Sequence, residues 1–309
     1  MRVILASHMG MCFGVKDAID MTESVEEPGL VTIHGELVHN AGVQERFKER
    51  GFHSVNEALR DGLPNSPFVL ITAHGVSDTE RSRLEESGKL LIDTTCPLVR
   101  RVHQAALHLQ SEGCLVLIAG RHGHVEVEGI IGDLQDYTVI QSPDDVQVFG
   151  HGRIGIVSQS TTPPWLFDEI CAEVRRTNPG KEIKVIDTVC APTRERQEAV
   201  QELLDVVEAL VVVGGKNSNN TRQLCHQAEL RGVPFFHVQD EHGLDAEVLL
   251  RFEVVGLTAG TSTPDSSIEK VHQALMELGK AERSLPRRIS PREGVTFTGR
   301  VASTSKVPH

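Results

Sequence analysis

Short apolar runs alternate with helix-length segments along most of this chain. The runs at 115–118 and 211–213 are continuously apolar, which is typical of strands that are buried on both faces of a sheet. Strands that alternate with helices predict parallel sheets covered by helices, which is an α/β fold. The segments of helical length lie at 41–50, 78–88, 97–112, 165–176, 192–208, 219–231 and 264–280.

The strand-like segments recur in a threefold pattern. LVTIHGELVHN, FVLITAHGVS and LLIDTTCPLV are followed by CLVLIAGRHGHVEVEG, GRIGIVSQSTTPP and IKVIDTVCAPT. The third set, ALVVVGGKNSNNT and FEVVGLTAGTSTPD, lacks a cysteine strand, which the N-terminal MRVILASHMGMC can supply. Repeats of this kind predict three similar parallel-sheet α/β units in a pseudo-threefold trefoil around a central cavity. The units are expected at 13–96, at 97–190 and at 191–280 completed by 1–12, followed by a basic tail at 281–309.

Composition narrows the class of protein. The 309 residues are 39% hydrophobic and 24% charged, with a net charge of −12, which disfavours a nucleic-acid-binding protein. No apolar run approaches the roughly 20 residues that a membrane-spanning helix needs. His8 interrupts the short apolar stretch at the N-terminus, so that stretch does not resemble a secretory signal. We therefore expect a cytoplasmic protein with reduced cysteines and no membrane partner.

The six cysteines divide into two groups. Cys96 and Cys190 each end an Ile-Asp-Thr-x-Cys segment, and Cys12 follows a strand and a glycine-containing loop. No CxxC pair is present, which disfavours thioredoxin-like chemistry and zinc ribbons. The other three adjoin apolar neighbours and are expected to be ordinary buried residues; they are Cys114, Cys171 and Cys225.

Ligands of parallel sheets bind beyond the carboxyl ends of the strands, so we expect Cys12, Cys96 and Cys190 to converge in the central cavity. A structural zinc normally has four protein ligands, and a site of three cysteines with His8 or His124 stays open as an alternative. Iron–sulfur clusters are usually held by four cysteines. With three, a [4Fe–4S] cluster would leave one iron without a protein ligand, available to a substrate as a Lewis acid.

The remaining loops predict a phosphate or diphosphate pocket. Histidines that can become charged, together with Ser and Asn side chains before helices, are suited to anions. Neither GxGxxG nor GxxxxGK[ST] is present. Glu126 is a candidate proton donor with a pKa raised by burial, and Asp93 and Asp187 are expected to orient the cysteine turns. The candidate anion ligands are His39, His74, His124, Ser218, Asn219, Asn220 and Ser262.

Over residues 1 to about 280 the sequence resembles the 4-hydroxy-3-methylbut-2-enyl diphosphate reductase family, which completes the methylerythritol phosphate route to isoprenoids. The resemblance rests, in family order, on MCFGV, ELVHN, TAHGVS, DTTCPLV, GHVEVEG, SQST, VCAPTRERQEAV, KNSNN and TAGTSTPD. It implies a reductive dehydroxylation that uses two electrons and two protons and yields isopentenyl and dimethylallyl diphosphate. It also implies an external electron donor such as ferredoxin or flavodoxin.

The resemblance assigns roles residue by residue. It implies a [4Fe–4S] cluster on Cys12, Cys96 and Cys190, with one iron free of protein ligands. Glu126 matches the proton-delivering glutamate, which His124 is expected to assist, and Ser160 and Thr161 match a hydroxyl relay. Asn219 stands where many members have Ser. The residues expected to bind the substrate are His39, His74, His124, Thr161, Ser218, Asn219, Asn220 and Ser262.

Several positions depart from the family pattern. Asp17 replaces a basic residue, Val125 replaces Pro, Pro192 enters the turn after a cysteine, and Ser160 takes a place often held by Thr. Asp17, Pro192 and Ser160 support one alternative, a non-catalytic cluster-bearing paralogue that binds diphosphates or senses redox state. A second alternative is a zinc-dependent hydrolase with Cys and His ligands.

Overall fold

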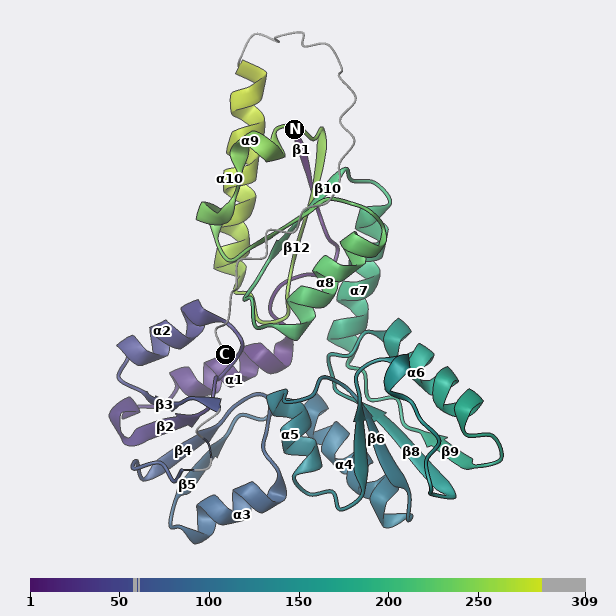
Figure 1. The fold of residues 1–309 in the computed structure, drawn as a ribbon. Helices are drawn as coiled ribbons and strands as arrows, with labels where there is room; N and C mark the ends of the chain where they lie inside the picture. The colour runs from purple at the N-terminus through teal and green to yellow at the C-terminus, as the bar shows by residue number, and fades with distance from the viewer. Residues whose placement is uncertain (58–59, 61, 285–309) are drawn as a thin grey trace, which may run out of the picture.

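A computed structural model describes residues 1–57, 60 and 62–284, in which the strands form three four-stranded parallel sheets (Figure 1). The first sheet has the order β3-β2-β4-β5, the second β7-β6-β8-β9 and the third β1-β12-β10-β11. In that order the strands are His53–Val55, Val31–His34, Phe68–Ile71 and Leu90–Asp93; then Tyr137–Ile140, Leu115–Ala119, Arg153–Ser158 and Glu182–Val185; then Arg2–Leu5, Val254–Ala259, Ala209–Val213 and Phe235–Val238.

The chain start completes the third sheet. Strand β1 pairs in parallel with β12, with Arg2 opposite Val254 and Leu5 opposite Leu257. The third sheet therefore combines residues from both ends of the described chain. This arrangement of three parallel-sheet units confirms the predicted α/β trefoil.

Helices cover both faces of the sheets. In chain order they are α1 Phe13–Glu23, α2 Ala41–Glu49, α3 Asp78–Glu86, α4 Pro97–Ser111, α5 Val125–Ile131, α6 Pro164–Thr177, α7 Ala191–Leu204, α8 Asn219–Leu230, α9 Ala246–Leu249 and α10 Asp265–Ser284. Short 3-10 turns lie at Pro28–Leu30, Pro143–Asp145 and Glu241–Gly243. On the second sheet, α4 and α5 share one apolar core and α6 packs in another. On the third sheet, α7 and α8 pack on one face and α10 on the other.

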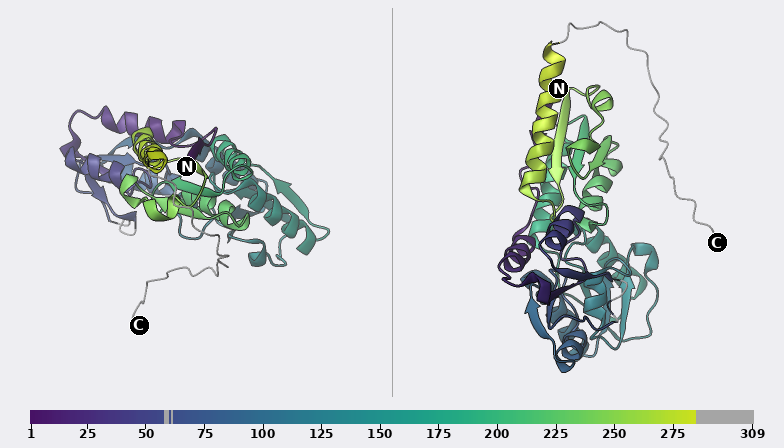
Figure 2. Two further views of the ribbon diagram at one scale, coloured as in Figure 1. Left: turned by 90° about the horizontal axis from the view of Figure 1, so that it is seen from above. Right: turned by 90° about the vertical axis from the view of Figure 1, so that its left-hand side faces the viewer.

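The three units lie side by side as lobes of a flat molecule (Figure 2). The strands end, and helices α1, α2, α4, α5, α7 and α8 begin, near the place where the lobes meet (Figure 1). The packing therefore brings helix N-termini and strand ends from all three units to one centre. None of the helices in the described part of the chain is long and apolar enough to cross a membrane.

Some elements were not predicted. The edge strands β3, β7 and β11 were missed because short, partly exposed strands carry little hydrophobic periodicity. Helix α5 was expected as a loop, but Val125–Ile131 is helical. Its V-E-V-E alternation imitates a strand, whereas the helix buries Val125, Glu126, Val127, Gly129 and Ile130.

Two predicted boundaries were wrong. Helix α7 ends at Leu204, four residues earlier than expected, where backbone bonds from Asp205 and Val206 to Glu202 and Leu203 tighten the last turn. Helix α10 runs to Ser284, so the first four residues assigned to the tail are helical. The rest of the predicted tail, 285–309, lies outside the described residues.

Candidate active site

A central pocket lies where the three units meet. All thirteen residues singled out from the sequence line it, from every unit, although their chemical roles stay predictions. They are Cys12, His39, His74, Cys96, His124, Glu126, Ser160, Thr161, Cys190, Ser218, Asn219, Asn220 and Ser262.

The three cysteines of the pocket occupy equivalent positions. Cys12, Cys96 and Cys190 are the N-cap residues of α1, α4 and α7. All three are free, half-buried thiols, whereas Cys114, Cys171 and Cys225 are buried in apolar cores. A helix N-terminus presents unpaired N–H groups and positive potential, which stabilise anionic sulfur. The three helices thus place three thiols in the central pocket, where each helix N-terminus would stabilise the thiolate form.

Burial keeps the Cys96 and Cys190 thiols protonated unless a metal binds. It raises the pKa of the Cys96 thiol, against backbone hydrogen bonds from Leu98 and Val99. It also raises the pKa of Cys190 to about 11, against hydrogen bonds from Thr193, whose Oγ1 lies 3.1 Å from Sγ. Metal binding displaces the proton of a thiol and leaves an anionic sulfur. The amide and hydroxyl donors beside Cys96 and Cys190 would stabilise that anion.

The structure shows how the cysteine segments are held together. Arg196 of α7 is buried, and its guanidinium donates to the carbonyl of Gly10 (3.0 and 2.8 Å) and to that of Pro192 (2.9 Å). The loop before Cys12 is thereby fixed to the helix that begins at Cys190. Arg196 was not predicted as a site residue, because only the tertiary structure brings it to Gly10.

Gly14 provides space beside Cys96. A Cβ at position 14 would overlap the Cys96 Sγ atom, so the glycine lets the first turn of α1 approach that thiol. We expect Gly14→Ala to displace Cys96 at a cost of about 1–3 kcal/mol and to lower bound iron per chain. Iron analysis after anaerobic purification and the melting temperature Tm would measure both effects. Gly29→Ala is the control, since its Cβ would meet no atom within 4 Å; equal iron in both variants would contradict the prediction.

Asp93 and Asp187 stabilise the cysteine turns, in agreement with the sequence-based expectation. The Asp93 carboxylate accepts from the Thr95 amide (2.9 Å), and Asp187 accepts from the Val189 amide (3.1 Å). Asp93 also pairs with Arg81 and Arg100. Each turn is therefore fixed within three residues of its cysteine.

The histidines form one cluster in the pocket. His39 stacks on His74 with ring centroids 4.3 Å apart, and His124 meets the two rings edge-on at 5.3 and 5.8 Å. Glu36, which the sequence reading missed, accepts a hydrogen bond from His39 Nδ1 (2.9 Å), and its backbone bonds to His74. The sequence feature that could have indicated this contact is the acidic residue three positions before His39. His39 Nε2 and His74 Nδ1 are buried without a partner.

The electrostatics correct one expectation. The sequence suggested histidines that can become charged, but burial lowers the pKa of His74 and, with the nearby His39 and Arg121, the pKa of His124 to about 3. These two rings are neutral at pH 7. His124 caps α5 by accepting the Glu126 amide at Nδ1 (3.1 Å), which leaves the proton on Nε2. It therefore offers a neutral N–H donor rather than a cation.

Glu126 has the environment of a proton donor. Its side chain is buried, and burial raises its pKa to about 7, although hydrogen bonds from Ser160 oppose the shift. The Ser160 amide donates to Oε1 (2.6 Å) and the Ser160 hydroxyl to Oε2 (2.9 Å). A carboxyl that is half protonated near neutral pH can both give and take a proton. The raised pKa agrees with the expectation from sequence.

The third unit contributes amide and hydroxyl groups. Ser218 is the N-cap of α8 and accepts from the Thr221 amide (3.3 Å), while Asn220 Oδ1 accepts from the Thr261 amide (3.1 Å). Ser262 donates to the His39 carbonyl (3.2 Å), which joins the third unit to the first. Asn220 Nδ2 is buried without a partner. This N–H group is a donor that could bind an anion, whereas the unpaired nitrogens of His39 and His74 are lone pairs in the neutral rings and would donate only when those rings are protonated.

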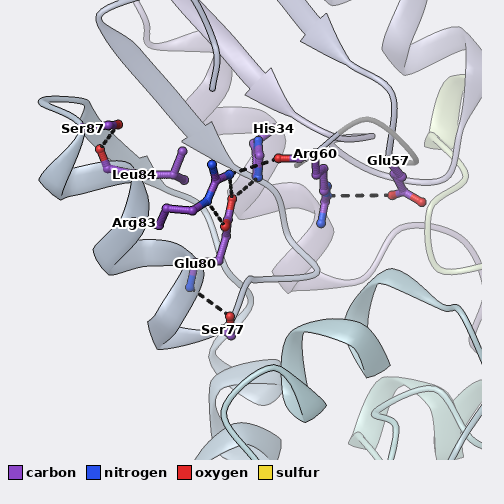
Figure 3. Close-up of polar contacts among 8 residues, drawn as sticks. All are labelled: His34, Glu57, Arg60, Ser77, Glu80, Arg83, Leu84 and Ser87. Atoms are coloured by element: carbon purple, nitrogen blue, oxygen red, sulfur yellow. Dashed lines mark hydrogen bonds and ion pairs between the residues drawn. The ribbon is translucent and has the colours of Figure 1, made fainter. Parts of the chain in front are cut away.

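Figure 3 shows a polar network that includes Glu57. A carboxylate oxygen of Glu57 lies within 4.8 Å of ring nitrogens of His39 and His74, so the network adjoins the histidine cluster. His34 bonds to Glu80 (3.0 Å), Glu80 pairs with Arg83 (2.6 Å), and Arg83 donates to the Arg60 carbonyl (3.1 Å). The Arg60 guanidinium in turn faces Glu57 at 3.9 Å. This network was not predicted, because the contacts that join its two local pairs to His34 and to each other span 46 and 23 residues.

The positions of the cysteines bear on the zinc alternative. A tetrahedral zinc with Zn–S bonds of about 2.3 Å holds its sulfur ligands within roughly 4 Å of one another. Among the described residues, the one group of three or more ligand atoms within 4.8 Å of one another is His39, Glu57 and His74. The cysteines are not part of it. A cluster in which each thiolate binds a different iron tolerates wider spacing, so the geometry disfavours a single zinc on these thiols.

The fold and the pocket define an α/β trefoil protein with one central site, built from three thiols, a buried acid and unpaired nitrogens. The LytB protein family profile matches residues 3–276. The 4-hydroxy-3-methylbut-2-enyl diphosphate reductase of Aquifex aeolicus is 35% identical over 284 residues, covering 89% of this chain and 96% of that protein. The Vibrio cholerae protein of that name is 33% identical, with coverages of 90% and 91%.

Solved structures agree with these relatives. The E-1-hydroxy-2-methyl-but-2-enyl-4-diphosphate reductase from Plasmodium falciparum superposes with a TM-score of 0.81 at 26% identity, covering 88% of this chain and 87% of that one. A second structure, described as (E)-4-hydroxy-3-methyl-but-2-enyl diphosphate reductase, the terminal enzyme of the non-mevalonate pathway, has a TM-score of 0.63 at 35% identity, with coverages of 90% and 100%. The chain belongs to the LytB family, which confirms the resemblance drawn from its motifs.

Proposed function

We propose that the protein converts 4-hydroxy-3-methylbut-2-enyl diphosphate to isopentenyl and dimethylallyl diphosphate by reductive dehydroxylation. That it is an oxidoreductase of isoprenoid biosynthesis follows from its family. The observation that carries the proposed reaction is one pocket that joins three free thiols to a buried carboxyl with a pKa of about 7 and to three unpaired nitrogens.

The thiols fit a [4Fe–4S] cluster held by Cys12, Cys96 and Cys190. Three helix N-termini stabilise the sulfurs, and Gly14 leaves space beside one of them. When bound, such a cluster supplies electrons and, at an iron without a protein ligand, a Lewis acid. An acidic carrier such as ferredoxin or flavodoxin is part of this proposal, as are the cytoplasmic location and the unit boundaries near residues 96 and 190.

The substrate diphosphate binds to the residues of the pocket that carry nitrogen and hydroxyl groups, rather than to the thiols. Asn220 Nδ2 is already desolvated and unpaired, so a phosphate oxygen gains a hydrogen bond there without displacing an existing one. His39 Nε2 and His74 Nδ1 are also unpaired, but each donates to a phosphate oxygen only if its ring takes up a second proton with the ligand, because the other nitrogen of each ring already bonds to Glu36. Ser218, Ser262 and the neutral N–H of His124 add further donors. Neutral donors suit a buried site, because unpaired cations would be costly to bury there.

Glu126 delivers the proton to the departing hydroxyl. At a pH below its pKa, the Glu126 carboxyl carries the proton that it delivers. The Ser160 hydroxyl, which donates to Oε2, can then pass a new proton to the carboxylate from the part of the pocket beside Thr161. The apolar side chains Val38, Leu98, Val99 and Pro192 line the same space and keep water from the allylic intermediate.

One experiment separates this proposal from its alternatives. The protein is purified anaerobically, its iron, zinc and sulfide are counted, and a chemically reduced donor is added with the hydroxylated isoprenoid diphosphate. Four irons per chain and formation of both isomeric diphosphates are expected. Four irons without turnover would favour the non-catalytic paralogue. Zinc alone would exclude both the reductase and the paralogue, because each needs an iron–sulfur cluster.

A further inference from the structure

A second cavity of about 360 Å³ adjoins the central pocket between the second and third units. Arg121 follows β6, Gln159 follows β8, and Arg222 and His226 lie on α8. Asn219 lines both this cavity and the central pocket, so the two share a wall. We call this second cavity the arginine vestibule.

The wall between the two cavities is held by only a few hydrogen bonds, and most of these are long. Asn219 Nδ2 donates to the Thr161 carbonyl (3.4 Å) and hydroxyl (3.3 Å), and Gln159 Nε2 donates to the same hydroxyl (3.1 Å). The Asn219 bonds are longer than the usual 2.7–3.2 Å range for N–H···O bonds. Since Asn219 lies on the third unit and Thr161 on the second, a small separation of the two units would open the wall.

The vestibule is cationic within an acidic protein. Its lining contains no Asp or Glu, and in the described part of the chain neither the Arg121 nor the Arg222 guanidinium forms an ion pair or hydrogen bond. By contrast, Arg81, Arg100 and Arg194 all pair with carboxylates. The charge of Arg121 also reaches the central pocket, where it contributes to the lowered pKa of His124. Unpaired guanidinium groups suit phosphate oxygens.

We infer that the arginine vestibule captures the diphosphate end of the substrate and passes it across the Thr161–Asn219 wall into the central pocket. The neutral donors of that pocket hold the diphosphate but attract it weakly at a distance. Two unpaired cations at an adjacent cavity supply the long-range attraction, which raises association rates and weakens with salt. The identity of the ligand rests on the proposed function, whereas capture of a diphosphate anion does not.

The first test uses the Arg121→Gln, Arg222→Gln double variant of the cluster-loaded enzyme. At low ionic strength we expect KM to rise about tenfold with kcat unchanged, and the difference from wild type to disappear at high salt. The Arg175→Gln, Arg251→Gln double variant, at two exposed positions outside the vestibule, removes an equal charge elsewhere and should change neither parameter. A KM equal to wild type at low salt, or a loss that is independent of salt, would overturn the inference.

The second test does not need turnover. Trp165 is the single tryptophan of the chain, and its ring centroid lies 6.2 Å from that of His226 in the vestibule wall. Inorganic diphosphate should change its fluorescence in the wild type with a salt-dependent association rate, and this change should be lost in the Arg121→Gln, Arg222→Gln variant. If this result holds and turnover is absent, the proposed function fails and the vestibule stands. If turnover is normal and the Arg121→Gln, Arg222→Gln variant binds like wild type, the vestibule fails alone.

Discussion

Glu126→Gln is expected to lower kcat by about 10²–10⁴-fold while substrate binding stays near normal. Glutamine has nearly the same shape and can still bond to Ser160, whose amide and hydroxyl both contact the native carboxylate. It has no acidic proton to deliver, so the defect should lie in turnover rather than in affinity. Steady-state kcat and equilibrium binding of the substrate measure the two separately.

Glu128→Gln is the matched control for this variant. Glu128 lies on the same helix, α5, but its side chain is exposed and does not line the pocket. It should turn over at the wild-type rate. A Glu126→Gln variant with near-normal kcat would remove Glu126 from the role of proton donor, even if Glu128→Gln behaved as expected.

The pH dependence of the wild type tests the same role. Burial raises the pKa of Glu126 to about 7, so the carboxyl is protonated below that pH and ionised above it. If the protonated form delivers the proton, kcat should be constant in mild acid and fall about tenfold per pH unit above 7. This limb should be absent from the residual activity of Glu126→Gln. A rate that rises through pH 7 would instead assign Glu126 as a base.

Much of the fold could be predicted because strong local signals coincide with the final structure. The continuous apolar runs became β6 and β10, and the helix after the cysteine at position 96 was placed to within one residue. The repeat of strand, polar loop and cysteine also predicted that β1 completes the third sheet. Where local and tertiary preferences differ, prediction failed, as in α5, whose alternating sequence imitates a strand.

The residues that line the site could be predicted from the sequence, but the hydrogen bonds and ion pairs that orient them could not. Residues at strand ends converge in any parallel sheet, which sufficed to bring together His39, His124 and Ser218. The partners that orient them come from elsewhere in the fold. Glu36 holds two histidines, and Arg196 of α7 bonds to the carbonyl of Gly10, 186 residues earlier in the chain. Burial, which makes His124 neutral and Glu126 a weak acid, is likewise a property of the packed structure.

Cys96→Ala is expected to abolish both the iron–sulfur absorption and turnover. Iron–sulfur clusters are usually held by four cysteines, and we propose three here, so the two thiolates left in this variant would be too few to retain a cluster. Cys225→Ala is the control, because Cys225 is a free, buried cysteine in the core of α7 and α8. It should keep four irons per chain, full activity and a stability within about 1 kcal/mol of wild type, since it removes only a small buried atom.

The same variant should also loosen the molecule. A cluster on the three cysteines closes chain segments of 84 and 94 residues, and cross-links of that length are each worth about 4–5 kcal/mol in the chain-entropy model. Loss of the proposed cluster would therefore remove a cross-link between the three units, which also meet through contacts such as the Arg196 and Ser262 hydrogen bonds. We expect a Tm several degrees lower and faster amide exchange at the starts of α1, α4 and α7. A Cys96→Ala protein that keeps four irons and full activity would show that Cys96 is not a ligand. One that loses iron but keeps its Tm would show that the units are joined by packing alone.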